Sequence, residues 1–144
     1  MQSEMLSDGE ERTFVLIFQS GESVVSGLQE FAETNGVVGS HFTAIGGLSD
    51  VTFAWFDWSK KQYEKAAEIQ EQVEVLSLIG DIALDRGKPK VHAHIVVGKR
   101  DGTAHGGHLM QAHVRPTLEV MLSQTPQSLR REHDPTSGLA LIRI

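Results

Sequence analysis

The sequence contains no cysteine, and this absence excludes several kinds of site. Disulfide bonds, thiolate nucleophiles, iron–sulfur clusters and cysteine-based zinc sites all need a sulfur atom that the chain does not supply. We therefore expect any bound metal ion to have nitrogen and oxygen ligands.

Long apolar runs and an excess of positive charge are also missing. No segment approaches the roughly 18 apolar residues that a membrane helix needs. The segment MQSEMLSDGEER lacks the basic-then-apolar pattern of a signal peptide, so we expect a cytoplasmic protein with no membrane partner. The 13 Lys and Arg against 19 Asp and Glu give a net charge of −6. This sign disfavours a protein that binds nucleic acid by neutralising phosphates.

The 144 residues suffice for one hydrophobic core. Residues 1–12 are polar, acidic and aperiodic, which predicts a loose N-terminal segment before a single domain over residues 13–144. The run Thr13–Gln19 is typical of a buried strand. Apolar residues at helical spacing from Val24, stopped by Asn35-Gly36, predict one clear helix.

The rest of the chain predicts strands joined by turns of hairpin length. Gly46-Gly47 is expected to separate two strands, at a place where backbones pack closely. Gln72–Leu84 has apolar residues on both faces and predicts a central strand covered on both sides. Ser123–Gly138 has little apolar content and is expected to be a connection. About seven strands in all predict an α+β fold, with a mostly antiparallel sheet packed with helices.

Five of the seven histidines lie in one block, KVHAHIVVGKRDGTAHGGHLMQAH. In the part VHAHIVV, the alternation of a strand places four apolar side chains on one face. His92 and His94 share the other face. The apolar face is expected to point into the core.

The length of the following turn decides where His108 lies. A two-residue loop at Asp101-Gly102 would turn His108 away from His94. A three-residue loop over residues 100–102 would place His108 directly opposite His94. We favour the longer loop because it directs Leu109 to the core and puts a glycine where a positive φ is needed.

In this register, His92, His94 and His108 converge, whereas His105 and His113 turn to the other face. Three neutral imidazoles without a fourth protein ligand predict an open site for a divalent metal, with zinc as the first choice. Such a site permits hydrolysis or hydration chemistry. The alternative is an oligomeric scaffold in which half-exposed strand histidines only pack.

Glu74 is the other candidate, because it shares a face with Leu76 and Leu78 in a strand expected to be buried. A buried carboxylate needs a cation or several donors. Glu74 is expected to orient a ligand histidine or to pair with Arg115, within or between subunits; a solvent-facing position at a strand edge explains it equally well. Asp81 is a weaker candidate, because Gly80 beside it suggests a bulge or turn.

Four stretches, in this order and spacing, resemble the PPC domain (DUF296), a family shared by plants and prokaryotes. They are HFTAIGGLSDVTFAWFD, QVEVLSLIGDIAL, KVHAHIVVGKRDGTAHGGHL and VRPTLEVML. The resemblance covers residues 13–144 and implies an antiparallel sheet packed on helices and assembly as a homotrimer. It also implies that His92, His94 and His108 are metal ligands, as is typical of stand-alone prokaryotic members.

The same resemblance raises DNA binding, which is often attributed to prokaryotic members. Plant members carry an AT-hook before the domain, whereas this sequence contains none, and its acidic charge disfavours DNA. The first hypothesis is therefore a homotrimeric metal-binding protein with a small-molecule or hydrolytic role. A DNA-binding or transcription-regulatory module is the alternative. The residues indicate no particular substrate or reaction.

Overall fold

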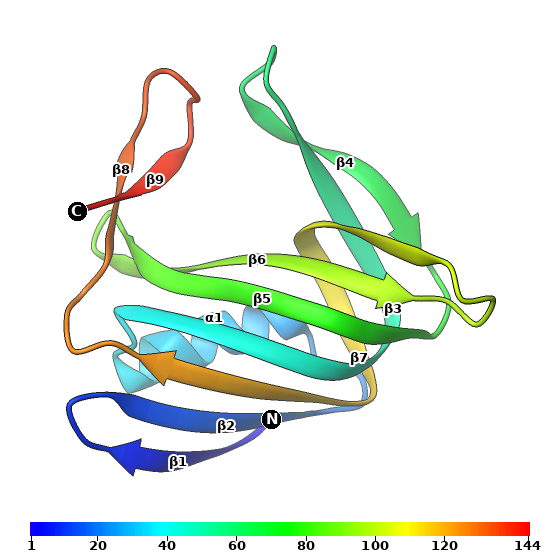
Figure 1. The fold of residues 1–144 in the computed structure, drawn as a ribbon, viewed down its shortest axis with the longest axis horizontal. Helices are drawn as coiled ribbons and strands as arrows, with labels where there is room; N and C mark the ends of the chain where they lie inside the picture. Colours follow the sequence, from blue (N-terminus) through cyan, green and yellow to red (C-terminus); the bar gives the residue numbers. More distant parts are fainter.

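The computed structural model describes residues 1–144 as one nine-stranded sheet with one helix (Figure 1). The elements are β1 (Gln2–Asp8), β2 (Arg12–Gln19), α1 (Val24–Asn35), β3 (Gly39–Asp57), β4 (Gln62–Ile69), β5 (Val73–Asp85), β6 (Lys88–Gly98), β7 (Ala104–Gln124), β8 (Arg130–His133) and β9 (Ala140–Arg143). The expected α+β class therefore holds in a sheet-dominated form. With 12 residues, α1 is too short to cross a membrane.

The segment expected to be loose, residues 1–12, instead contains an edge strand. β1 pairs antiparallel with β2 from Gln2↔Ile17 to Asp8↔Arg12. Every residue of β1 is exposed, so backbone hydrogen bonds to β2 hold this strand in place with little help from burial. A search for apolar periodicity misses such a strand because neither of its faces is buried.

The helix forms where the sequence predicts it. α1 buries one stripe of side chains, consisting of Val24, Leu28, Phe31 and Ala32, and packs against β6 and β7. Gly36 follows in the left-handed conformation, with φ of 62°, and ends the helix. In Figure 1 the helix lies behind the sheet, so it covers one face and leaves the other open.

The Gly46-Gly47 pair does not divide β3, which runs without a break for 19 residues. A Cβ on Gly46 would lie 2.3 Å from the carbonyl oxygen of Thr117, and one on Gly47 would lie 2.3 Å from that of Arg115. The prediction of close backbone packing is therefore confirmed, since β7 passes too near for any side chain. The pairing registers of β3 shift at this point, so the strand bends instead of ending.

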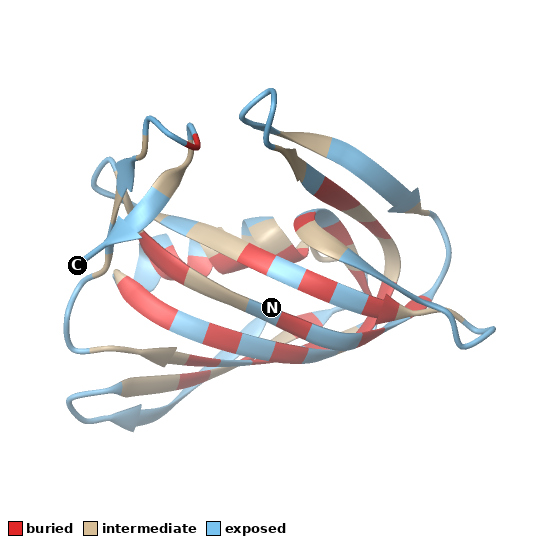
Figure 2. Cartoon of the chain, turned by 45° about the horizontal axis from the view of Figure 1, so that its top comes forward, coloured by how far each residue is buried: buried red, intermediate tan, exposed pale blue.

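Four strands form a closed circuit, because β7 pairs with β3, β3 with β5, β5 with β6, and β6 with β7. Buried and exposed residues alternate along these strands (Figure 2). The buried side chains, which include Phe18, Phe42, Phe53 and Leu118, fill the space between the sheet and α1. The β3–β4 and β8–β9 hairpins extend beyond the same edge of the sheet (Figure 1).

β5 lies between β3 and β6, as expected of a central strand, but only one of its faces is covered. A register shift between Val75 and Ser77 changes the alternation of its side chains. Leu78 therefore faces the core, whereas Leu76 and Ile79 are 56% and 55% exposed. The apolar residues on both faces of β5 predicted that both faces would be covered. In the single chain only one face is covered.

Candidate metal centre

The β6–β7 hairpin turns through the three residues from Arg100 to Gly102. The backbone N–H of Lys99 donates to the carbonyl oxygen of Thr103 at 2.9 Å, which closes the last pair before the turn. The N–H of Gly102 donates back to Lys99 at 2.9 Å, and Gly102 has a φ of 83°. This geometry is the longer of the two loops considered, with glycine in the left-handed position.

The turn places His94 of β6 directly opposite His108 of β7. Leu109 consequently points into the core, as this register requires. His92 lies two residues before His94, and the ring centroids of the three histidines are 5.2 to 5.3 Å apart. One ring nitrogen from each histidine lies within 4.8 Å of the other two, so the group has the dimensions to hold a metal ion.

The remaining histidines of the block stay outside this cluster. His105 is exposed and lies 3.4 Å from the hydroxyl of Thr103. His113 interacts through Nδ1 with a carboxylate oxygen of Asp50 at 2.8 Å. Both histidines therefore lie outside the cluster, as expected. For His113 the predicted face was wrong, because a register shift between β3 and β7 places it between the buried Ala112 and Val114 and so on the face away from the core.

Burial favours the neutral form of two of the clustered histidines, His94 and His108. The pKa of His108 is lowered to about 4, first by burial and then by the neighbouring His92 and His94. Burial and the charge of His92 also lower the pKa of His94. Only four buried side-chain nitrogen or oxygen atoms in the protein lack a hydrogen-bond partner, and His92 Nε2 and His108 Nδ1 are two of them. Neutral imidazoles with unpartnered nitrogens have the form that binds a metal ion.

Tyr63 of β4 fixes one side of the cluster. Its ring stacks on His108 with centroids 4.0 Å apart and an angle of 24° between the planes. Burial raises the pKa of Tyr63, so its hydroxyl stays protonated at neutral pH. The β3–β4 hairpin thus holds one face of the His108 ring through Tyr63.

The carboxylate beside the histidines is that of Asp81, on β5 directly opposite His92 of β6. One oxygen of Asp81 lies 3.6 Å from His92 Nδ1, and the other accepts a hydrogen bond from Arg131 Nη2. Burial raises the pKa of Asp81, but the interactions with His92 and Arg131 outweigh it, and the net pKa is lowered. Asp81 therefore remains charged and holds the imidazole of His92 by its Nδ1 side, which leaves Nε2 free.

Glu74, the carboxylate expected to take this role, lies elsewhere on β5. It is exposed, it pairs in register with Gly98, and neither hydrogen bond nor ion pair links it to Arg115. The bulge after Val75 explains the difference, because Glu74 does not share a face with the buried Leu78. Within one chain Glu74 therefore faces solvent, whereas its pairing with Arg115 between subunits stays a prediction.

Arg131 is the residue that the sequence reasoning missed. It lies on β8, a four-residue strand inside the segment expected to be a connection, and pairs in parallel with Asp85 of β5. The side chain of Arg131 is only 8% exposed. Four residues are too few for a pattern of alternation to be detected, and the following sequence offers no other signal for a buried arginine.

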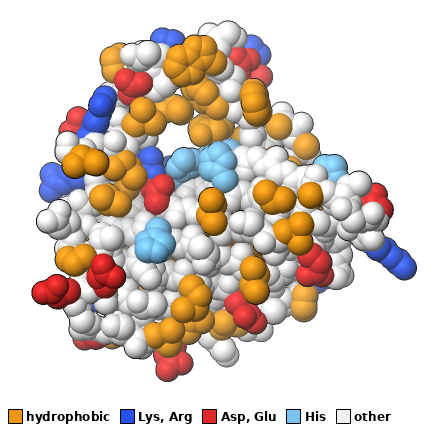
Figure 3. Space-filling view, viewed as in Figure 1, with side chains coloured by type: hydrophobic (Ala, Val, Ile, Leu, Met, Phe, Trp, Pro, Cys, Tyr) orange, Lys and Arg blue, Asp and Glu red, His pale blue; other side chains and the backbone are white.

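A cavity of about 390 Å³ opens beside His92 and His108. Its walls combine polar groups with apolar side chains from the β8–β9 hairpin, among them Leu139 and Leu141. Figure 3 shows the pale blue histidines at the rim of a hollow, with hydrophobic side chains around it. The cluster thus faces an accessible space that a small molecule can enter.

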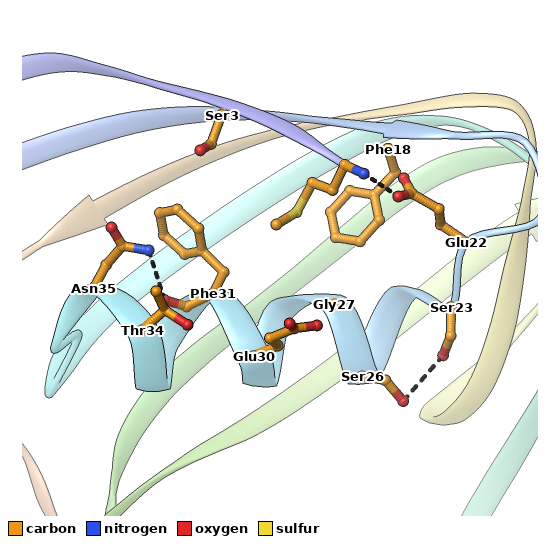
Figure 4. Close-up of a pocket in the computed structure, with 11 residues that line it drawn as sticks. Ser3, Phe18, Glu22, Ser23, Ser26, Gly27, Glu30, Phe31, Thr34 and Asn35 are labelled. Carbon is orange, nitrogen blue, oxygen red and sulfur yellow. Dashed lines mark hydrogen bonds and ion pairs between the residues drawn. The ribbon is translucent and has the colours of Figure 1, made fainter.

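A larger cavity of about 500 Å³ lies between the start of the chain and α1 (Figure 4). Glu22 and Glu30 line it together with serine and threonine side chains, and Glu22 is bonded to the amino group of Met1. It contains none of the clustered histidines. The chemistry of the protein therefore concentrates at the smaller cavity.

Comparison with known proteins assigns the chain to a family. It is 32% identical to a metal-containing protein of Archaeoglobus fulgidus, with 100% of this chain and 99% of that chain covered and a TM-score of 0.85. It is 28% identical to a candidate DNA-binding protein of Ralstonia eutropha JMP134, with 91% and 90% covered and a TM-score of 0.85.

Among curated proteins, the chain is 27% identical over 142 residues to the bifunctional protein GlmU of Synechococcus sp. (strain JA-3-3Ab). That match covers 96% of this chain, which spans about a fifth of the GlmU length, since 21% of GlmU is covered. Residues 5–126 match the family model of the Plants and Prokaryotes Conserved domain. The chain therefore belongs to the Plants and Prokaryotes Conserved (PCC, or PPC) domain family.

Proposed function

We propose that this protein binds a divalent metal ion, with zinc as the first candidate, through His92, His94 and His108. The observation that carries the proposal is the convergence of three imidazoles of which two have buried nitrogens without a partner. A buried polar atom left unpaired costs about 1–3 kcal/mol, and a bound cation would remove this cost at both nitrogens. The likeness to the metal-containing protein of Archaeoglobus fulgidus supports the same reading.

Three nitrogen ligands leave a divalent ion with an open position, where it acts as a Lewis acid. The surrounding residues have separate tasks in this proposal. Asp81 orients His92, Tyr63 orients His108, and the cavity beside them admits the molecule that the site acts on. The role that fits this arrangement is binding, hydrolysis or hydration of a small molecule.

Assembly as a homotrimer is the second part of the proposal. It rests on the family resemblance and is supported by apolar side chains on the sheet face that α1 leaves open. Thr43 pairs in register with both Ile79 and Met121, so these side chains lie on one face, and Ile45 follows two residues later on the same strand. Ile45, Ile79 and Met121 are 62%, 55% and 46% exposed. Contact between copies of the chain would bury them.

Metal analysis tests the metal site directly. The protein is purified without a polyhistidine tag, and bound metal is measured by mass spectrometry together with the His94→Ala variant. We expect about one zinc ion per wild-type chain and none in the variant. His105→Ala is the matched control, because His105 belongs to the same hairpin but lies outside the cluster. Wild-type protein that takes up no metal, even after zinc is added, would refute the proposal.

DNA binding is the second candidate function, and the Ralstonia eutropha relative is the observation in its favour. The net charge of −6 per chain opposes it, because phosphates would be repelled. A titration of duplex DNA at two salt concentrations separates the candidates. We expect weak binding at both; a tight complex with a steep salt dependence would reverse the order of the two functions.

A further inference from the structure

We propose that the cavity beside the three histidines binds a small organic monocarboxylate, with its carboxylate between Arg131 and the histidines and its apolar part against β9. The inference rests on the proposed metal site and names the class of ligand that this site takes. Its starting point is the guanidinium of Arg131, whose side chain is 92% buried, the complement of its 8% exposure. Arg131 also forms part of the cavity wall.

One nitrogen of the Arg131 guanidinium, Nε, has no hydrogen-bond partner. Nη2 donates to Asp81 and Nη1 donates to the carbonyl oxygen of Ala140 at 3.2 Å, whereas Nε is buried and has no acceptor. Three of the four unpartnered buried polar atoms of the protein therefore belong to residues that line this one cavity, namely His92, His108 and Arg131. Unpaired buried polar atoms are rare in folded proteins. The proposed metal ion accounts for the two histidine nitrogens, so Arg131 Nε is the donor that remains for a ligand.

Asp81 shows that Arg131 and the histidines are close enough to share one ligand. Its two carboxylate oxygens interact with Arg131 on one side and with His92 on the other. One carboxylate therefore already spans the space between the guanidinium of Arg131 and the imidazole of His92, so a ligand carboxylate near Arg131 would also lie near the histidine cluster.

The charges of the cavity favour an anion. Asp85 and Lys90 line the wall and offset each other, and Asp81 offsets Arg131. Histidines bind a metal ion in their neutral form, so the three histidines add no charge of their own to the proposed site. A divalent ion would therefore give the cavity a net positive charge, which one or two negative charges of a ligand balance.

The rest of the lining selects a monoacid with an apolar body. Eight of the 13 lining residues are hydrophobic, including Met110, Leu139 and Leu141. Only one unpartnered donor, Arg131 Nε, is available besides the histidines. A phosphate or a second carboxylate would find too few donors, whereas an aliphatic chain would bury apolar surface against β9.

The experiment is a calorimetric titration of zinc-loaded and metal-free protein with 4-methylpentanoate and with its neutral analogue 4-methylpentanamide. We expect the acid to bind the zinc-loaded protein at least about tenfold more tightly than the amide, since a charge-assisted hydrogen bond is lost. The variant Arg131→Lys keeps a cation for Asp81 but removes the Nε donor, and it should lower the affinity for the acid by about tenfold.

A second variant tests the apolar end without touching Asp81 or Arg131. Leu141→Glu places a negative charge in the cavity wall and should weaken binding of the acid at least about tenfold. Leu6→Glu is the control, because Leu6 is an exposed leucine on β1 and does not line the cavity. Its affinity for the acid should equal that of the wild type.

The result separates this inference from the proposed metal site. Zinc-loaded protein that binds neither probe, or binds acid and amide equally, overturns the carboxylate inference and leaves the metal site standing. If the protein takes up no zinc, the proposed metal site is refuted, and the titration of the metal-free protein tests the carboxylate site alone. A preference for the acid that is lost in Arg131→Lys supports the carboxylate site. Equal binding of acid and amide, or binding of neither, overturns it.

Discussion

His94 and His108 face each other across β6 and β7, with ring centroids 5.3 Å apart, because the turn between their strands has three residues. Side chains on a strand alternate between faces, so the length of the turn selects the face on which His108 lies. The candidate metal site thus depends on a segment that contributes no ligand to it.

Deletion of Asp101 should abolish zinc binding, and it should also lower the stability of the protein, because the register shift that moves His108 also turns Leu109 out of the core. The shortened loop favours the two-residue register, in which His108 points away from His94. Equilibrium dialysis against zinc measures the effect. Arg100→Ala, which changes the turn without shortening it, should bind zinc as the wild type does. Full zinc binding by the deletion variant would contradict the register argument.

Asp81→Asn should weaken zinc binding by about 10- to 100-fold, the usual effect of removing a carboxylate that orients a metal-binding histidine. The loss follows from the contact between Asp81 and His92 Nδ1. Competition with a zinc chelator gives the two affinities. Glu74→Gln is the control with the same chemical change on the same strand, and it should have no effect because Glu74 is exposed and distant in register.

The metal-free protein should lose stability as the pH falls from about 6.5 to about 4. The pKa of His108 in the folded protein is about 4, below the 6.5 of an unperturbed histidine, so the unfolded chain binds more protons over this window and stability rises with pH. Each pKa unit corresponds to about 1.4 kcal/mol, and partial solvent access to His108 reduces the total to about 1–2 kcal/mol.

Urea unfolding at several pH values tests this dependence. His108→Gln removes the titrating group, so the difference in unfolding free energy between the wild type and this variant should shrink toward low pH. A difference that stays constant from pH 7 to pH 4 would show that His108 titrates normally. Zinc must be removed beforehand, because a bound ion would compete with the proton.

Gly46→Ala should destabilise the protein by about 2 kcal/mol or more, because its Cβ would clash with backbone that cannot move independently. The relevant distances are 2.3 Å to the carbonyl oxygen of Thr117 and 2.8 Å to Cα of Leu118. Gly9→Ala serves as the control, since its Cβ would meet nothing closer than 3.9 Å. Thermal unfolding of both variants gives the comparison, and equal melting temperatures would refute the close-approach argument.

Ile45→Glu should dissociate the proposed trimer into monomers that remain folded. Ile45 is 62% exposed on the open sheet face, where a charge is harmless to one chain but costly in a contact between chains. Sedimentation velocity measures the mass. Trp58→Glu, at an equally exposed position on the β3–β4 hairpin, should leave the assembly unchanged. A monomeric wild type would remove the basis of this prediction.

Local patterns in the sequence predicted the helix, most of the core strands and the histidine register. Each of these features depends on residues that are close in the chain. They are the apolar stripe of α1 followed by Gly36, the apolar run that forms β2, and Gly102 in the β6–β7 turn. A turn has few possible geometries, so one well-placed glycine decided between two registers. The convergence of three histidines was therefore accessible without a structure.

The errors arose where long-range pairing overrides local pattern. A bulge in β5 turns Glu74 to the exposed face, and the carboxylate beside His92 is that of Asp81, which the sequence indicated only as the weaker candidate. Edge pairing ordered β1 and the parallel contact with β5 ordered β8, although neither strand has an apolar pattern of its own. Arg131 could not be placed at the site because its position depends on where β8 meets the sheet.

The contact between Asp81 of β5 and Arg131 of β8 joins two parts of the chain that are synthesised at different times. The three histidines are complete once β7 has been made, whereas Arg131 and Leu141 follow on β8 and β9. A chain that folds as it emerges would thus be able to bind the proposed ion before the wall of the proposed ligand cavity exists. The protein would first become a metal binder, and only the docking of the last hairpin would give that ion a chemical environment that discriminates among acids.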